Sequence, residues 1–412
     1  MFFHRSLLNA LLGPTSREKV RLLFGARQTG KTALLRQVLQ QSEPAQLFDL
    51  QDTALRRQLE SDPARFGREV RALPKQKQVI VVDEIQKVPA LLEEVQSLYD
   101  SAPGRWRFFL TGSSARRLRA GAANLLPGRS HLFRIHPITR WEEGGEDLAI
   151  AEPRAATSKG KRVPPPFRQQ SLQRQLLFGS LPGVRMESTA SATATLDAYV
   201  ATYVEEEVRR EALVRDLGPF QVFLRLAALE SGQVTNLAKL SQESGVPAST
   251  LKSHYQVLVD TFVGHWMAAY GHPSRKRVLT TPRFYWFDLG VRNAAAQLPP
   301  TSELLQSQGG PLLEHWVAQE LLARADHLGR GHRVTFWRTV DGVEVDFVFE
   351  GPRADVPIEV KWTERPRPED ARHVELFLDR FGDRAKRGLV VCRCERPQQL
   401  TDRVTAIPWS HL

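Results

Sequence analysis

Residues 25–32 read GARQTGKT, and residues 79–84 read VIVVDE. The first stretch follows the apolar residues 22–24 and opens the amphipathic stretch KTALLRQVLQQ, so a strand should lead into it and a helix should follow. It fits the phosphate-cradling pattern G-x-x-x-x-G-K-[ST] in full. The second stretch places two carboxylates directly after four apolar residues, as at the end of a buried parallel strand. The two stretches predict an α/β domain with a phosphate site at one edge of its sheet.

The residue types in GARQTGKT explain what this loop can bind. Gly25 and Gly30 let the backbone wrap tightly, so that its N–H groups can face the phosphates of ATP. Lys31 neutralises the β- and γ-phosphates, Thr32 offers its hydroxyl to Mg²⁺, and the start of the following helix adds a positive dipole end. The remaining members of the predicted nucleotide site in this loop are Ala26, Arg27, Gln28 and Thr29.

The acidic pair gives the predicted site a hydrolytic role. Asp83 should project from the strand end towards Mg²⁺, and Glu84 is placed to polarise the attacking water. A further strand, FFLTGSS (108–114), ends in hydroxyls, of which Ser113 or Thr111 can sense the γ-phosphate or simply close a buried strand. Arg129 can reach the nucleotide of a neighbouring subunit as an arginine finger, or it is an ordinary surface arginine.

The whole chain fits a soluble, cytoplasmic protein with a polyanionic partner. Its 412 residues imply two or three domains, and no apolar run is long enough to cross a bilayer. The N-terminus lacks the layout of a signal peptide, and two cysteines suit a reducing cytosol. The 57 basic residues exceed the 46 acidic ones by 11, which favours DNA as a partner.

The chain divides into four stretches by pattern. Residues 1–143 alternate buried strands with helices, which predicts a parallel sheet covered on both faces. Residues 144–168 are small, polar, basic and proline-rich, as in a linker or a mobile loop. Residues 169–300 read as mostly helical, and residues 301–412 alternate helices and strands.

The middle stretch carries a helix–turn–helix pattern over residues 237–262, followed by two short strands around a basic turn. This order predicts a winged helix whose second helix can enter a major groove, unless the bundle is only a lid on the first domain. The predicted DNA-contacting residues are Lys252, His254, Arg275, Lys276 and Arg277.

The last stretch predicts a second site. Asp346 lies on the second strand of a hairpin turned at Asp341-Gly342, and Glu359 and Lys361 are two residues apart on the next strand, on one face. Two carboxylates can hold Mg²⁺ or Mn²⁺ while the lysine orients a water, which suits phosphodiester hydrolysis. Glu314, on the preceding helix, can complete the site. The alternative is a hairpin with charged faces and an ordinary ion pair.

These motifs resemble those of the prokaryotic AAA-type ATPases that carry a C-terminal DUF4143 domain. The matching stretches are GARQTGKT, VVDEIQKVP, FFLTGSSARRL, PGR…HPITRWEE, FGSLPGV, and EVDFV with IEVK. The resemblance covers almost the whole chain and implies an AAA+-like P-loop domain, a winged-helix domain and a nuclease-fold C-terminal domain. Residues 144–168 depart from the family pattern as an insertion.

The C-terminal pattern of helix, three strands, helix and strand also resembles the PD-(D/E)xK nucleases, archaeal Holliday-junction resolvases above all. Val345 stands where the motif has a proline. The leading hypothesis is therefore a Mg²⁺-dependent ATPase acting on branched or duplex DNA, compatible with a homo-oligomer formed through the ATPase domain. The rival is a nucleotide-controlled signalling switch whose inactive C-terminal scaffold binds protein. A transporter-type ATPase is disfavoured because no segment engages a membrane.

Overall fold

The computed structural model describes residues 5–14, 18–42, 44–114, 126–144, 169–204, 217–271, 281–339 and 341–412. The chain forms two compact units, the first of Met1–Pro137 with Gln256–Val263, and the second of Ile138–Tyr255 with Gly264–Leu412. None of the described helices is both long enough and apolar enough to span a membrane. The predicted α/β architecture with a parallel N-terminal sheet is confirmed.

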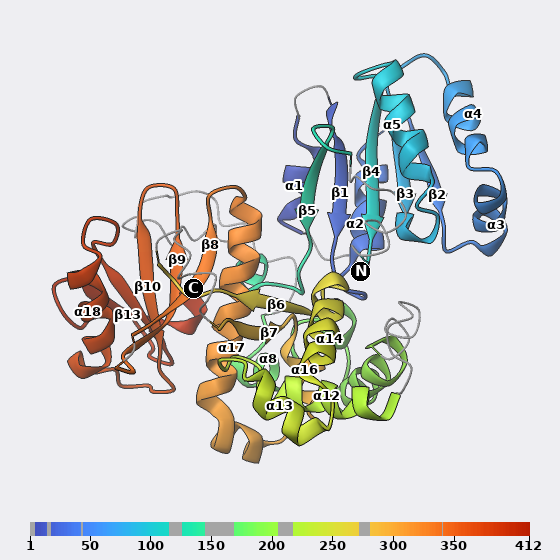
Figure 1. The fold of residues 1–412 in the computed structure, drawn as a ribbon. Helices are drawn as coiled ribbons and strands as arrows, with labels where there is room; N and C mark the ends of the chain where they lie inside the picture. The colour runs from blue at the N-terminus through green and yellow to red at the C-terminus, as the bar shows by residue number, and fades with distance from the viewer. Residues whose placement is uncertain are drawn as a thin grey trace. The chain divides into compact units, whose positions relative to one another are not determined.

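The first unit is built on a five-stranded sheet in the order β2-β3-β4-β1-β5, and every neighbouring pair is parallel (Figure 1). Parallel strands need both faces covered, which explains why β1 and β3 are buried along their whole length. All carboxyl ends of the strands therefore lie at one edge. The strands are β1 (Val20–Phe24), β2 (Ala45–Asp49), β3 (Gln78–Asp83), β4 (Trp106–Gly112) and β5 (Ser130–Arg134).

Helices cover the two faces of this sheet with two separate apolar cores. Leu34 and Val38 pack with Val81 on one face, and Leu92 and Val95 pack on the other. Alternate residues of β3 supply the two cores, as the period-two geometry of a strand requires. The helices are α1 (Leu7–Leu12), α2 (Lys31–Gln40), α3 (Thr53–Ser61), α4 (Ala64–Ala72), the 3₁₀ turn η2 (Ile85–Lys87) and α5 (Leu91–Ser101).

The second unit begins with a helical segment that ends in a β-hairpin. Asn236 caps the N-terminus of α13 with its side chain, and Gly245, at φ 68°, ends that helix at the predicted turn. Leu251, in the helix after this turn, is fully buried. The elements are α7 (Arg140–Gly144), α8 (Leu172–Phe178), α9 (Pro182–Arg185), α10 (Thr189–Ala198), the π-helical η3 (Tyr199–Val204), α12 (Leu217–Leu229), α13 (Leu237–Ser244), α14 (Ala248–Asp260), β6 (Gly264–Met267), β7 (Arg283–Trp286) and α16 (Leu289–Ala295). The last turn of α14, from Gln256 on, belongs to the first unit.

The C-terminal segment forms a six-stranded mixed sheet in the order β12-β13-β11-β10-β9-β8. Its elements follow the predicted order of helix, three strands, helix and strand. They are α17 (Ser302–Leu328), β8 (Arg333–Arg338), β9 (Glu344–Glu350), β10 (Asp355–Val360), η4 (Pro368–Ala371), α18 (Arg372–Arg380), β11 (Gly388–Cys392), β12 (Gln398–Gln399), β13 (Val404–Pro408) and η5 (Trp409–His411).

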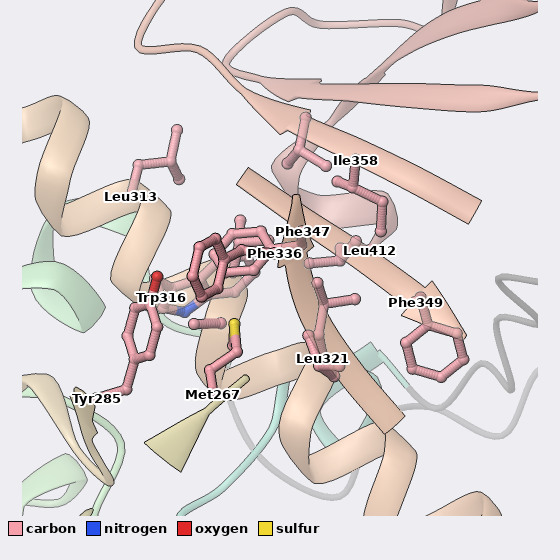
Figure 2. Close-up of a cluster of buried hydrophobic side chains, with 14 of the residues drawn as sticks. Met267, Tyr285, Leu313, Trp316, Leu321, Phe336, Phe347, Phe349, Ile358 and Leu412 are labelled. Atoms are coloured by element: carbon pink, nitrogen blue, oxygen red, sulfur yellow. The ribbon is translucent and has the colours of Figure 1, made fainter. Parts of the chain in front are cut away.

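The hairpin β6–β7 shares a hydrophobic core with this sheet (Figure 2). Met267 of β6 and Tyr285 of β7 lie in one cluster with Trp316 of α17 and Phe347 of β9. The chain beyond β6 also reaches the edge of the sheet, because the N–H of Phe336 donates to the Ala268 carbonyl at 3.2 Å. The boundary predicted at residue 300 thus falls inside one compact unit.

Two of the motifs quoted above serve to join the parts of the second unit. In FGSLPGV, Gly179 has φ +69° and the N–H of Ser180 donates to the Asp288 carboxylate at 2.7 Å. In HPITRWEE, the N–H of Arg140 donates to both oxygens of Glu320 at 3.0 Å. Both carboxylates are buried, so these contacts replace the solvation that the carboxylates lose.

The two cysteines of the chain lie at the end of β11. Cys392 is fully buried and Cys394 is nearly so, and neither forms a disulfide. Burial raises the pKa of the Cys392 thiol to about 12. Both thiols belong to the apolar core between β11 and α18.

Candidate functional site

The GARQTGKT loop connects the end of β1 to the start of α2 and wraps closely against the sheet. Gly25 is required by this packing, because a Cβ there would lie 2.5 Å from the Ile135 carbonyl oxygen. Gly30 has φ 96°, a conformation that favours glycine. The ammonium of Lys31 donates to the carbonyls of Gly25 and Ala26, each at 2.9 Å, and so lies over the loop itself.

Side chains of the loop contribute to its shape. The hydroxyl of Thr29 is fully buried and donates to the Ala26 carbonyl at 2.8 Å, closing the loop from within. Gln28 is exposed with φ 61°, and Arg27 is half-buried. The structure therefore brings the predicted residues 25–32 into one tight turn at the N-terminus of α2, where backbone N–H groups and the helix dipole favour an anion.

Asp83 and Thr32 meet at the carboxyl edge of the sheet. The Thr32 hydroxyl donates to Asp83 Oδ2 at 2.7 Å, and the Thr111 hydroxyl donates to Asp83 Oδ1. Asp83 is buried at the last position of β3. Hydroxyl and carboxylate oxygens are the ligands that Mg²⁺ prefers, so this donor set fits the predicted cofactor. Thr111 thus contacts Asp83, the carboxylate predicted to bind Mg²⁺.

Glu84 is held in place by three side chains. Its backbone has φ 61° and ψ 46°, and its N–H donates to the Thr111 hydroxyl at 3.0 Å. Its Oε2 accepts from the Ser113 hydroxyl at 3.1 Å and from the Gln86 amide, which also reaches Ser113 at 3.0 Å. Ser113 therefore lies next to Glu84, the carboxylate predicted to polarise the attacking water, and its predicted role at the γ-phosphate stays a prediction.

Arg129 lies at the other end of the sheet. Its carbonyl accepts from the N–H of Val20, the first residue of β1, whereas the loop follows the last residue of β1. Its guanidinium is paired with Asp100 at 2.7 Å. The structure does not bring Arg129 to the nucleotide site of its own chain, and a role towards a neighbouring subunit stays a prediction.

The C-terminal carboxylates Asp346 and Glu359 lie on neighbouring strands. Asp346 Oδ2 accepts from the N–H of Val360 at 2.8 Å. Glu359 Oε1 accepts from the Lys361 ammonium at 2.7 Å, while its Oε2 is buried with no hydrogen-bond partner among the described residues. Burial, and then the charge of Asp346, raise the pKa of Glu359 to about 8. Burial also raises the pKa of Asp346. The predicted trio is thus brought together.

Glu314 is turned towards other partners. Its Oε1 accepts from Arg283 at 3.0 Å and from the Tyr285 hydroxyl at 3.3 Å, both on β7. Burial, and then the charge of Asp346, raise its pKa to about 7. Within the described ranges no three or more His, Cys, Asp or Glu side chains are grouped to hold a metal ion. Asp346 and Glu359 are carboxylates of the kind that a hard divalent cation prefers.

Comparison with known proteins assigns three segments. Residues 17–143 match the AAA domain family. Residues 309–412 match the domain of unknown function DUF4143, and residues 169–302 match the domain of unknown function DUF8612. The chain is therefore similar to an AAA domain at one end and to a DUF4143 domain at the other.

Two curated relatives, both uncharacterized, come from Mycobacterium tuberculosis and Mycobacterium bovis. Each is 25% identical over 400 residues, which cover 95% of this chain and 80% of the relative. A solved structure of a Vibrio cholerae protein is 11% identical and covers 94% of both chains, with a TM-score of 0.20, which supports no argument about fold.

The predicted DNA contacts of the DUF8612 segment are corrected in one place. His254 does not face solvent: it is 4% exposed and stacks edge-on against Phe220 at 4.9 Å between ring centroids. The cause is the helical period, which places His254 three residues after the buried Leu251. Lys252 is exposed, as predicted. The predicted contacts Arg275, Lys276 and Arg277, like the linker residues 145–168, lie outside the described residues.

Two residues of the AAA domain site escaped the sequence reasoning. Gln86 lies in the VVDEIQKVP stretch, and an amide two residues after the predicted carboxylate Glu84 is a usable signal for it. Arg5, from the apolar N-terminus, donates to the carbonyl of Thr29 in the loop at 2.8 Å. No spacing rule links Arg5 to a loop so far along the chain.

Proposed function

We propose that the chain is a Mg²⁺-dependent ATPase whose nucleotide site is the loop of residues 25–32 with Asp83 and Glu84. The observation that carries the proposal is the 2.7 Å hydrogen bond between Thr32 and Asp83, which joins the two halves of the motif at one sheet edge. In this assignment Lys31 and the loop N–H groups bind the β- and γ-phosphates, and Thr32 and Asp83 hold Mg²⁺. Bound Mg²⁺ supplies neutralisation of phosphate charge.

Glu84 is the proposed general base. It holds a water in line with the γ-phosphate and accepts its proton, while Ser113 and Gln86 fix the carboxylate. Lys31 leaves the carbonyls of Gly25 and Ala26 when phosphate arrives, because an anion is the stronger partner for an ammonium. The AAA domain match over residues 17–143 supports this assignment.

The proposal extends to DNA as the molecule acted upon. Its support is the net charge of +11, the exposed Lys252 on α14, and the trio Asp346, Glu359 and Lys361 on the DUF4143 sheet. In the nuclease version, Asp346 and Glu359 hold Mg²⁺ or Mn²⁺, and Lys361 orients the attacking water beside a phosphodiester.

One observation favours the rival, a nucleotide-controlled switch that binds protein. Glu314, the carboxylate predicted to complete the site, is bonded to Arg283 and Tyr285, although it lies close enough to Asp346 for that charge to raise its pKa. A C-terminal domain whose third predicted carboxylate is already paired suits an inactive scaffold as well as a nuclease.

The test measures ATP hydrolysis and DNA cleavage together, on four-way junction, duplex and single-stranded DNA with Mg²⁺ or Mn²⁺. Lys31→Ala should abolish ATP hydrolysis, and Asp346→Ala should abolish cleavage while leaving ATP hydrolysis intact. Hydrolysis without binding to any DNA would support the protein-binding switch. No hydrolysis and no nucleotide binding by the wild-type protein would overturn the ATPase proposal.

A further inference from the structure

Arg5 is a buried charge placed under the phosphate-binding loop. Arg5 is only 5% exposed. In the sequence it lies before residue 17, where the AAA domain match begins. Nη1 donates to the Thr29 carbonyl at 2.8 Å, and Nη2 donates to the His136 carbonyl at 2.7 Å. A buried guanidinium is retained where its hydrogen bonds replace its lost hydration, so the three carbonyls that it reaches, including that of Pro137, are its solvation.

The bond to Thr29 has a consequence for the next amide. The peptide unit is planar and trans, so the carbonyl of Thr29 and the N–H of Gly30 point in opposite directions. Arg5 holds the carbonyl on the protein side of the loop, which leaves the Gly30 N–H facing the other side. That side is where a cradled phosphate must lie, because the loop binds phosphate through backbone N–H groups.

Arg5 is itself held by the helix that follows it. Its carbonyl accepts from the N–H of Leu8 at 3.0 Å, in the first turn of α1. Leu7, Leu8 and Leu11 are buried in the same core as Leu34 of α2, the helix that the loop opens. The guanidinium and the loop are therefore fixed to one rigid support.

The second contact joins the loop to the exit of the first unit. His136 and Pro137 are the last residues of the first unit before the chain enters the second. One guanidinium thus connects the backbone of the loop to the backbone through which the chain leaves the domain.

We propose that Arg5 is a positioning residue of the nucleotide site, which orients the Thr29–Gly30 peptide so that the Gly30 N–H faces the phosphates. The inference rests on the proposed nucleotide binding. It assigns a functional role to a segment that lies before the matched AAA domain.

The test compares Arg5→Met and Arg5→Lys with a matched control, Arg21→Met. Arg21 is also fully buried in the first unit and donates to backbone carbonyls, those of Gly13 at 2.8 Å and Lys19 at 3.2 Å, away from the loop. We expect Arg5→Met to weaken the binding of a fluorescent ADP analogue about tenfold or more, as loss of the Gly30 N–H bond to a charged phosphate would. Arg5→Lys should recover part of this affinity, because an ammonium can still reach one carbonyl.

A purely structural role predicts a different pattern. Thermal unfolding without nucleotide reports stability, so equal loss of affinity in Arg5→Met and Arg21→Met at equal loss of stability would overturn the inference. Unchanged affinity in both Arg5 variants would overturn it too, with ATP binding by the wild-type protein still standing. No binding by the wild-type protein would instead remove the proposed function. Steady-state kinetics should show a raised KM for ATP with kcat nearly unchanged in Arg5→Lys.

A measurement on the wild-type protein covers the case in which the Arg5 variants do not fold. ADP should slow amide hydrogen exchange in residues 5–13 as well as in the loop, because the two are linked by the guanidinium. Protection confined to the loop would overturn the inference.

Discussion

Glu84 has a backbone conformation that its neighbours hold in place. Its left-handed backbone conformation, at φ 61°, is uncommon outside glycine and costs on the order of 1 kcal/mol or more. The surroundings enforce it, because its N–H is bonded to Thr111 and its carboxylate to Ser113 and Gln86. These contacts hold the backbone and the carboxylate of Glu84 in one conformation.

Replacing that carboxylate should separate binding from turnover. Glu84→Gln keeps the shape of the side chain and removes the base, so we expect kcat for ATP to fall about 10²- to 10⁴-fold with nucleotide affinity nearly unchanged. The measurement is steady-state hydrolysis beside equilibrium binding of an ADP analogue. Glu93→Gln, at an exposed carboxylate on α5, is the control and should change neither. Retained turnover in Glu84→Gln would contradict the assigned role.

Glu359 supplies a prediction about pH. Its pKa is raised to about 8 in the folded protein. Between the ordinary pKa of a glutamate and about pH 8, the native state therefore binds more protons than the unfolded state. Stability should therefore fall as the pH rises through this window, and Glu359→Gln should flatten the fall. Urea unfolding from about pH 6 to about pH 9 measures it. Equal pH dependence in the two proteins would contradict the raised pKa.

At the scale of an element, the turn between α8 and α9 depends on one glycine. Gly179 has φ +69°, and a Cβ there would overlap the Asp288 carboxylate that binds the N–H of Ser180. Gly179→Ala should destabilise the second unit by about 2 kcal/mol or more. The causes are a strained backbone at residue 179 and displacement of the Asp288 carboxylate from the Ser180 N–H. Thermal unfolding checks this. Gly183→Ala, in the same FGSLPGV motif but with open space at its Cβ position, should cost much less.

Helix α14 carries the prediction for DNA. Lys252→Gln should weaken DNA binding and lower the salt dependence by about one counterion, without loss of stability. The matched control is Lys239→Gln on α13, an exposed lysine paired with Glu230 at 2.8 Å. His254→Ala should instead destabilise, because it leaves a cavity beside Phe220 and Phe223. Titrations of DNA binding at several salt concentrations measure these effects. Equal effects of the two lysine substitutions would contradict the assignment of Lys252 as a DNA contact.

At the scale of the whole molecule, the two units should respond to different conditions. Among the described residues, every carboxyl group with a raised pKa lies in the second unit: Asp288, Glu314, Glu320, Asp346 and Glu359. The proposed nucleotide site lies in the first.

We therefore expect calorimetry to resolve two unfolding transitions. ADP with Mg²⁺ should raise the transition of the first unit by mass action, and raising the pH through about 8 should lower that of the second. Lys31→Ala serves as the control, since it should remove the response to ADP and leave the response to pH. One transition that moves under both treatments would contradict this independence.

Sequence reasoning reached the parts of the molecule that depend on local order. The loop at 25–32 and the strand before Asp83 have fixed spacing, and Asp346, Glu359 and Lys361 follow from strand alternation in neighbouring strands. It failed at His254, whose placement depends on which helix face packs inward, and at Arg5, which meets Thr29 only through tertiary folding. Gln86 is an intermediate case. The sequence analysis included it in a motif but predicted no contact for its side chain.

The buried cysteines give the protein a built-in reporter of its own opening. Cys392 and Cys394 are the two thiols of the whole sequence, and both sit behind the DUF4143 sheet. A thiol-reactive dye can modify them when β11 separates from α18. The labelling rate therefore reports opening of that sheet and does not report nucleotide binding directly. Added ATP that changes this rate would reveal communication between the two ends of the chain without any engineered probe.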